Sequence, residues 1–153
     1  MGMAAKVLLV EDSKLLRIAG ERALTKAGYF VYTASDGEQA ITVANEQLPD
    51  IILLDMLIPK ISGLDVLRTL KNTSATKEIP VVVVSGLSQA NAEKLIAAGA
   101  TDYFEKSTLA LDKNSDLLAP VVEKVLRHVR HERELEKRLL ELAAKKAAGV
   151  GDG

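Results

Sequence analysis

The sequence contains no cysteine and no tryptophan, and only 3% of its 153 residues are aromatic. Without cysteine the chain forms no disulfide bond and no zinc–thiolate site, and it has no thiol nucleophile. Only two histidines are present, His128 and His131, which argues against a histidine-rich metal site. Because aromatic residues are so scarce, the core must be built from aliphatic side chains.

The chain also lacks an excess of charge of either sign, because 20 Lys and Arg residues face 21 Asp and Glu residues. The composition therefore gives no support for a general attraction to nucleic acids or anionic membranes. No apolar run approaches the length that crosses a bilayer, and the N-terminal residues lack the features of a signal peptide. We expect a cytoplasmic protein that makes no direct contact with nucleic acid or membrane.

Five short segments are predicted to form β-strands: residues 7–10, 30–33, 51–54, 81–84 and 101–104. The clearest of them are continuous aliphatic runs, which are typical of strands covered on both faces in a parallel sheet. Segments with helical apolar spacing lie between them, over about residues 14–27, 37–48, 63–70 and 90–98. This alternation predicts a doubly wound α/β fold with a five-stranded parallel sheet.

The C-terminal part differs in composition. No helix-breaking residue occurs between Pro120 and Ala148, so the sequence predicts one extended helix there. Its first half is apolar enough to pack on the sheet, whereas the residues beyond Arg130 are too polar to form the core of the same domain. We therefore expect a globular domain over residues 5–129 and a helical extension or linker over residues 130–153.

Charged and hydroxyl-bearing residues stand at the carboxyl ends of the predicted strands. Glu11 and Asp12 follow the first strand, Asp55 the third and Ser85 the fourth, and Lys106 comes shortly after the fifth. Ligands of doubly wound sheets bind outside these strand ends. Any one of these residues alone fits a helix cap or a solvated loop, but all five together at strand ends favour a functional site.

The chemistry of this set indicates a metal ion and a phosphoryl group. A cluster of carboxylates needs a counter-charge, and a ligand set of oxygen atoms alone favours Mg²⁺. A lysine and a hydroxyl are suited to the remaining oxygens of a phosphoryl group. The sequence has no glycine-rich phosphate-binding loop, so a nucleotide is not the expected source of phosphate. A carboxylate is therefore the expected phosphoryl acceptor.

The sequence motifs around these residues resemble those of response-regulator receiver domains in two-component signalling: VLLVEDS at 7–13, LLDMLIPKISG at 53–63, VVVVSG at 81–86 and GATDYFEKS at 99–107. Over about residues 5–129, the resemblance implies a flavodoxin-like fold with strand order 2-1-3-4-5, as in chemotaxis regulators. It also implies a signalling phosphoacceptor rather than an enzyme. Its partners would be a histidine kinase or phosphotransfer protein and a downstream protein target.

The resemblance assigns the metal site and the phosphoryl acceptor. Asp55 would be the nucleophile that receives the phosphoryl group. Asp12, Asp55 and the backbone carbonyl oxygen of Leu57 would bind Mg²⁺ directly, while Glu11 would act through a water molecule.

The resemblance also assigns the residues that respond to phosphorylation. Ser85 and Lys106 would hold phosphoryl oxygens, and Tyr103 would change rotamer together with Ser85 on activation. Tyr103 also fits a half-buried strand residue with no further role. Gly86 is small, which would leave the approach to Asp55 open.

Two residues depart from the usual pattern of the family. The family usually has a proline after the lysine, joined by a cis peptide bond, whereas Ser107 follows Lys106 here. A cis bond without proline costs about 3 kcal/mol, so either that cost is borne or the loop is rearranged. The acidic pair is Glu11 and Asp12 rather than two aspartates, which keeps the charge.

The outer half of the C-terminal helix carries a short apolar seam of Leu135, Leu139 and Leu142. The seam favours a homodimer through this helix, or a connection to another domain, over a free solvated tail. One alternative is therefore that the chain is a receiver and linker from a larger regulator whose effector domain is missing.

A second alternative is a phosphatase of the haloacid dehalogenase type, which also uses an aspartate nucleophile with Mg²⁺. Such an enzyme needs a second aspartate two residues after the nucleophile. Leu57 stands at that position, which argues strongly against a phosphatase.

The lifetime of the phosphorylated state can also be predicted from the resemblance. In receiver domains, the residues at the positions of Leu57 and Leu87 flank the path of the hydrolytic water. Neither leucine can hydrogen-bond a water molecule, so we expect slow hydrolysis. The alternative is that both side chains point away and leave the path open.

Overall fold

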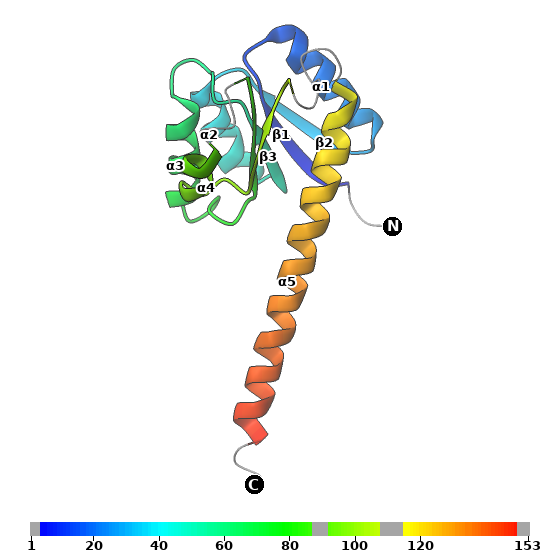
Figure 1. Ribbon diagram of the computed structural model, residues 1–153, viewed down its shortest axis with the longest axis vertical. Coiled ribbons are helices and arrows are strands. Elements are labelled where there is room, and N and C mark those ends of the chain that lie inside the picture. The colour runs from blue at the N-terminus through cyan, green and yellow to red at the C-terminus, as the bar shows by residue number, and fades with distance from the viewer. Residues whose placement is uncertain (1–3, 87–91, 108–114, 150–153) are drawn as a thin grey trace. The chain divides into compact units, whose positions relative to one another are not determined.

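The computed structural model describes residues 4–86, 92–107 and 115–149. The chain divides into two compact units, Met1–Val121 and Val122–Gly153. The first unit contains a five-stranded parallel sheet in the order β2-β1-β3-β4-β5, which confirms the predicted fold class (Figure 1). The strands are β1 (Lys6–Val10), β2 (Phe30–Ala34), β3 (Ile51–Leu54), β4 (Val81–Ser85) and β5 (Asp102–Glu105).

The helices lie close to their predicted positions. They are α1 (Lys14–Lys26), α2 (Gly37–Gln47), α3 (Gly63–Asn72), α4 (Ala92–Ala97), the 3-10 helix η2 (Ser115–Leu117) and α5 (Leu118–Gly149). The helix expected over residues 90–98 corresponds to α4, and the first of those residues lie outside the described ones.

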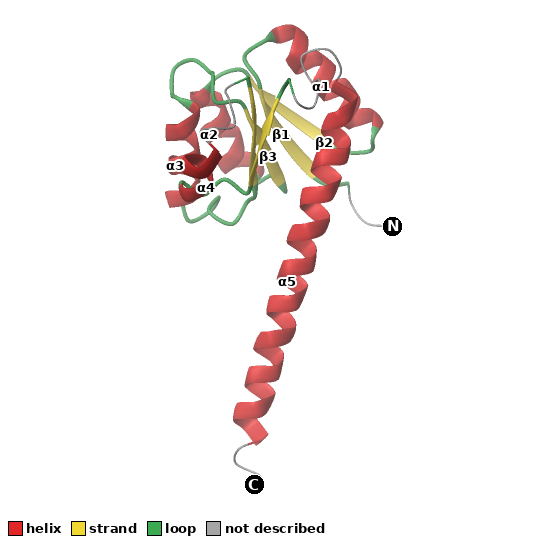
Figure 2. Ribbon diagram, viewed as in Figure 1, coloured by secondary structure: helices red, strands yellow, loops and turns green. Residues whose placement is uncertain are grey.

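The sheet is covered on both faces, which explains the continuous apolar strands. Helices α2, α3 and α4 lie on one face, and α1 lies on the other (Figure 2). Leu8 and Val10 of β1 belong to the cluster on the first face, whereas Leu9 lies against Gly20 of α1 on the other. Every residue of β3 and β4 is buried. Burial on both faces therefore removes the polar alternation that a half-exposed strand would show.

Side-chain caps start the helices soon after the strands end. The side chains of Ser13, Asp36 and Ser62 each accept a hydrogen bond from the backbone N–H three residues later, which satisfies an N–H that the helix leaves unpaired. At the other end of α2, Leu48 adopts a left-handed conformation with φ of 46°, directly before Pro49. The three N-terminal caps lie at the carboxyl edge of the sheet, where the site lies, whereas Leu48 lies before β3 at the opposite edge.

Helix α5 is continuous from Leu118 to Gly149, so Pro120 falls in its first turn, where its missing N–H costs no helical hydrogen bond. Every residue over 131–149 is exposed, including the three leucines of the predicted seam. Among the described residues, no helix is both long and apolar enough to cross a membrane.

Candidate functional site

Asp55 lies directly after β3, in the middle of the sheet. Its backbone N–H donates to the carbonyl oxygen of Val10 at 3.2 Å, and the residue is only 7% exposed. Its Oδ1 accepts hydrogen bonds from the backbone N–H of Leu57 at 3.0 Å and from Ser85 Oγ at 3.1 Å. A buried carboxylate with this many donors is held in one orientation, as a nucleophile requires.

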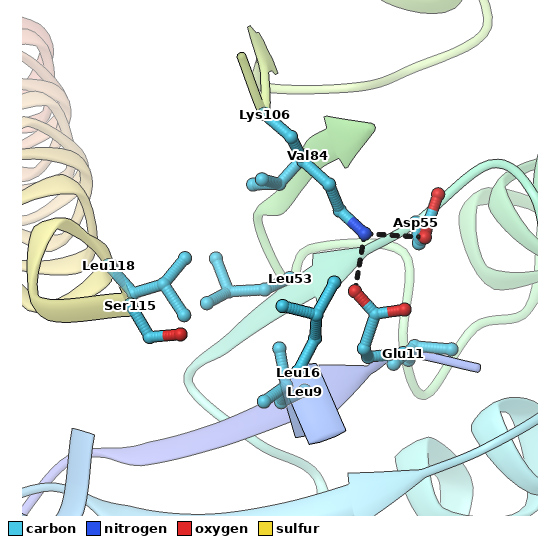
Figure 3. A pocket seen from close by; sticks show the side chains of 10 residues that line it. Leu9, Glu11, Leu16, Leu53, Asp55, Val84, Lys106, Ser115 and Leu118 are labelled. Atoms are coloured by element: carbon cyan, nitrogen blue, oxygen red, sulfur yellow. Dashed lines mark hydrogen bonds and ion pairs between the residues drawn. The ribbon is translucent and has the colours of Figure 1, made fainter. Parts of the chain in front are cut away.

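Lys106 brings a positive charge to the same carboxylate. Its backbone N–H donates to the carbonyl oxygen of Ser85 at 2.9 Å, which continues the pairing of β5 with β4. Its Nζ lies 2.9 Å from Asp55 Oδ2 and also forms an ion pair with Glu11 Oε1 (Figure 3). One ammonium group is therefore the shared counter-charge of two buried carboxylates.

The pKa of Lys106 reflects two opposed effects. Burial by itself lowers this pKa, but the hydrogen bonds and negative charges of Glu11 and Asp55 outweigh burial and raise it above its ordinary value. The side chain therefore stays positively charged at neutral pH.

The two acidic residues after β1 have different environments. Glu11 is buried, and its second oxygen, Oε2, accepts a hydrogen bond from the backbone N–H of Ser13 at 3.1 Å. Asp12 is exposed. Four of the five residues predicted to meet at the strand ends, namely Glu11, Asp55, Ser85 and Lys106, are therefore linked by direct contacts, whereas Asp12 lies at the exposed edge of the site.

The donor set of the site fits Mg²⁺ in its chemistry. The carboxylates of Glu11 and Asp55, the exposed carboxylate of Asp12 and the backbone carbonyl of Leu57 are all hard oxygen donors. In the part of the chain that the structure describes, no three histidine or acidic side chains are grouped closely enough to hold a metal. In this arrangement Lys106 supplies the counter-charge to Glu11 and Asp55.

Tyr103 lies in β5 and is buried. Its pKa is raised, first by burial and then by the negative charges of Glu105 and Asp55. The phenol is therefore neutral at physiological pH. Its movement with Ser85, which is buried at the end of β4, stays a prediction.

The loop after Lys106 does not use a cis bond. All peptide bonds between described residues are trans, including the one between Lys106 and Ser107. Of the two possibilities, a cis bond between Lys106 and Ser107 at its energetic cost is therefore wrong. Lys106 reaches Asp55 with a trans bond.

Two features of the site were not predicted from the sequence. A small pocket lies beside the Lys106 ion pairs and is lined in part by Glu11, Asp55 and Lys106 (Figure 3). Mostly apolar side chains complete its wall: Leu9, Val10, Leu16, Leu53, Val84, Ser115 and Leu118. Arg17 donates to the backbone carbonyl oxygens of the acidic pair. Apolar spacing could have indicated the leucines, but a basic residue on an amphipathic helix gives no such signal.

The sequence of residues 7–114 matches the family described as the response regulator receiver domain. The chain belongs to this family. The receiver domain spans most of the first unit and contains Glu11, Asp55, Ser85 and Lys106. Receiver domains are components of two-component signalling systems.

Three proteins illustrate the similarity. The response regulator PleD of Caulobacter vibrioides is 38% identical over 105 residues, which are 68% of this chain and 23% of that protein. A protein-glutamate methylesterase/protein-glutamine glutaminase of Archaeoglobus fulgidus is 37% identical over 124 residues, 78% of this chain and 35% of that protein. The structure of the chemotaxis response regulator CheY4 of Vibrio cholerae is 29% identical with a TM-score of 0.71, covering 80% of this chain and 98% of that one. The chain spans less than half of the length of the curated relatives it matches.

Proposed function

We propose that Asp55 accepts a phosphoryl group from a partner histidine kinase or phosphotransfer protein. The observation that carries the proposal is the buried Asp55 carboxylate, contacted by the Ser85 hydroxyl, the Leu57 N–H and the Lys106 ammonium group. An Asp55 oxygen would form a bond to phosphorus as the bond from phosphorus to the partner's histidine nitrogen breaks, which gives an acyl phosphate.

Lys106 and Ser85 have defined roles in this step. The ammonium group of Lys106 would neutralise charge on the phosphoryl oxygens, and the hydroxyl of Ser85 would donate a hydrogen bond to one of them. Asp12, Asp55 and the Leu57 carbonyl would hold Mg²⁺, with Glu11 acting through water. Bound Mg²⁺ supplies further positive charge to the phosphoryl oxygens.

The output of the domain would be a change in protein contacts. Ser85 would turn toward the phosphoryl group and Tyr103 would change rotamer with it, which alters the surface offered to a downstream protein target. The family match and the balanced charge of the chain support a receiver over residues 5–129 that acts in the cytoplasm, with residues 130–153 as a helical extension. An aspartate-nucleophile phosphatase is not supported, because Leu57 offers no acid at the required position.

The test is incubation of the full chain with acetyl phosphate and Mg²⁺, followed by intact mass spectrometry. We expect one phosphoryl group on the native protein and none on the Asp55→Asn variant. The Asp102→Asn variant, altered in β5 rather than in the site, serves as a control and should be labelled like the native protein. Equal labelling of the native and Asp55→Asn proteins would overturn the proposal.

Replacing Asp12 with asparagine should weaken Mg²⁺ binding, because it removes one of two direct carboxylate ligands. An affinity loss of about tenfold or more is expected from calorimetric titration of Mg²⁺ into the native and variant proteins. Asp50→Asn, at the opposite end of β3, serves as the charge-matched control. An unchanged affinity in Asp12→Asn would mean that the metal is bound elsewhere.

Removal of the helical extension should abolish self-association. An isolated polar helix gains little stability from intrinsic propensity, so packing is the expected reason for three exposed leucines in one seam. Sedimentation of the full chain would be compared with a chain that ends after Arg130 and with the Leu135→Gln/Leu139→Gln variant. Monomers in all three cases, with and without phosphorylation, would contradict the dimer and favour a connection to an effector domain.

Phosphate on Asp55 should be lost slowly, and a polar residue at Leu57 should accelerate the loss. Leu57 is 59% exposed and lies two residues after Asp55, whereas Leu87 lies outside the described residues. An asparagine at position 57 can orient a water molecule, which leucine cannot do. The decay of phosphate after removal of the donor would be followed in the native protein, in Leu57→Asn, in Leu57→Asn/Leu87→Glu and in the apolar control Leu57→Met. Equal decay rates in all four would refute the explanation.

A further inference from the structure

Arg17 connects α1 to the acidic pair at the end of β1. Its backbone N–H donates to the carbonyl oxygen of Ser13 at 2.8 Å, so the residue belongs to the first turns of the helix. Its side chain extends back toward the strand, where Nη1 donates to the carbonyl oxygen of Glu11 at 3.0 Å and to that of Asp12 at 3.3 Å. One guanidinium nitrogen thus bridges two consecutive carbonyl groups.

These carbonyl groups lie just beyond the regular pairing of the sheet. The register of β1 with its two neighbours ends at Val10, which pairs with Ala34 of β2 and Leu54 of β3. Beyond Val10, the Glu11 N–H still donates to the carbonyl oxygen of Ala34 at 3.0 Å. Backbone carbonyl groups beyond the end of a strand need a hydrogen-bond donor from outside the sheet. The structure shows Arg17 as a donor to the carbonyl oxygens of both Glu11 and Asp12.

The contact fixes the direction of the chain at Asp12. Two carbonyl oxygens held by one nitrogen restrict the peptide plane between Glu11 and Asp12, and this plane sets the direction in which the Asp12 side chain leaves the backbone. The Glu11 side chain is restrained separately, because Oε2 accepts from the Ser13 N–H and Oε1 pairs with Lys106. Arg17 is therefore the contact that acts on Asp12, the exposed member of the acidic pair.

The positive charge of Arg17 also stabilises the turn of Glu11 and Asp12. Its guanidinium group brings a positive charge to a turn that carries two adjacent carboxylates. Arginine stays ionised at every relevant pH, and its hydrogen bonds to carbonyl oxygens are stronger than those of a neutral donor. An apolar side chain of similar length could fill the same space but could not donate to these carbonyl oxygens.

We infer that Arg17 is a positioning residue that holds the turn of Glu11 and Asp12 so that the Asp12 carboxylate is presented to Mg²⁺. The inference rests on the proposed function, in which Asp12 is a direct ligand. Partners that orient metal ligands typically change metal affinity by 10- to 100-fold when they are removed. Arg17 would thus affect the metal site without contacting the metal.

The test is the Mg²⁺ affinity of the full chain, measured by calorimetry with Mg²⁺ alone. Arg17→Met should weaken the affinity about tenfold or more, and Arg17→Lys should restore part of it, because an ammonium group can also donate to these carbonyls. Arg22→Met provides the matched control, since Arg22 is an exposed arginine of the same helix and should bind Mg²⁺ like the native protein.

A double variant separates positioning from a general structural role. In the Asp12→Asn background, Arg17→Met should cause little further loss of Mg²⁺ affinity, because its effect passes through Asp12. The same additional loss in both backgrounds, or native affinity in Arg17→Met, would overturn the inference. If Arg17→Met does not fold, the Mg²⁺ affinities of Arg17→Gln and Arg17→Lys are compared in the native and Asp12→Asn backgrounds instead. Failure of the native protein to bind Mg²⁺ would instead refute the proposed function.

Discussion

Replacing Lys106 with methionine should lower the free energy of unfolding by about 3 kcal/mol in Mg²⁺-free buffer. The ammonium group is the shared counter-charge of two buried carboxylates, so its removal leaves Glu11 and Asp55 without a positive partner. Methionine retains an apolar stem similar to that of lysine. Urea denaturation of the native and variant proteins measures the difference, with the exposed Lys94→Met as the control.

The same variant should alter the dependence of stability on pH. The pKa of Lys106 is raised above its ordinary value of 10.5 in the folded protein, so the folded state holds this proton more tightly than the unfolded state. Its contribution to stability is complete below about pH 10.5 and is lost as the pH rises through the folded pKa. The native protein should therefore lose more stability than Lys106→Met as the pH rises above about 10.5.

Lys106→Met also distinguishes metal binding from phosphorylation. The variant should still bind Mg²⁺, because no proposed ligand is removed, but it should fail to maintain the phosphorylated state. A variant with native stability, a native pH profile and native phosphoryl retention would show that the ion pairs of Lys106 have no energetic role.

Replacing Gly63 with alanine should destabilise the protein by about 2–3 kcal/mol. A Cβ atom on Gly63 would lie 2.5 Å from Met56 Cα, 2.9 Å from the Met56 carbonyl oxygen and 3.0 Å from that of Asp55. These neighbours are backbone atoms of the segment that carries the acceptor, so they cannot move aside as a side chain could. Phosphoryl uptake should therefore slow together with the loss of stability.

Gly86→Ala is the matched control for this prediction. Among the described residues, nothing lies within 4 Å of a Cβ atom built on Gly86, so the substitution should leave the free energy of unfolding unchanged or raise it slightly. Thermal or urea denaturation of both variants makes the comparison. Equal effects at the two positions would show that the close approach of Gly63 to the acceptor segment does not limit stability.

Much of the fold follows from local patterns in the sequence. The continuous aliphatic runs of β1, β3 and β4 predict strands buried on both faces, and the structure buries them in this way. The helical apolar spacing over about residues 14–27 predicts a helix, and α1 occupies Lys14–Lys26 with Ser13 as its N-terminal cap. Because the carboxyl ends of parallel strands share one edge, the positions of Asp55, Ser85 and Lys106 after their strands were enough to predict that they meet.

Other features depend on side-chain reach, which the sequence does not reveal. Glu11 and Asp12 are equivalent as adjacent acids in the sequence, but only Glu11 is buried and in contact with Lys106. The link from Arg17 back to the strand depends on the path of a long side chain and carries no periodic signal. The start of α5 before Pro120 depends on the preceding 3-10 turn.

The most direct test of the central claim is chemical identification of the phosphorylated atom. The chain would be incubated with acetyl phosphate and Mg²⁺, treated with borohydride, which reduces an acyl phosphate on aspartate to homoserine, and digested for peptide mass spectrometry. The account predicts homoserine at position 55 and aspartate at position 12, with Ser85 unmodified. Homoserine at position 12, phosphate on Ser85, or phosphorylated protein with intact Asp55 would contradict it.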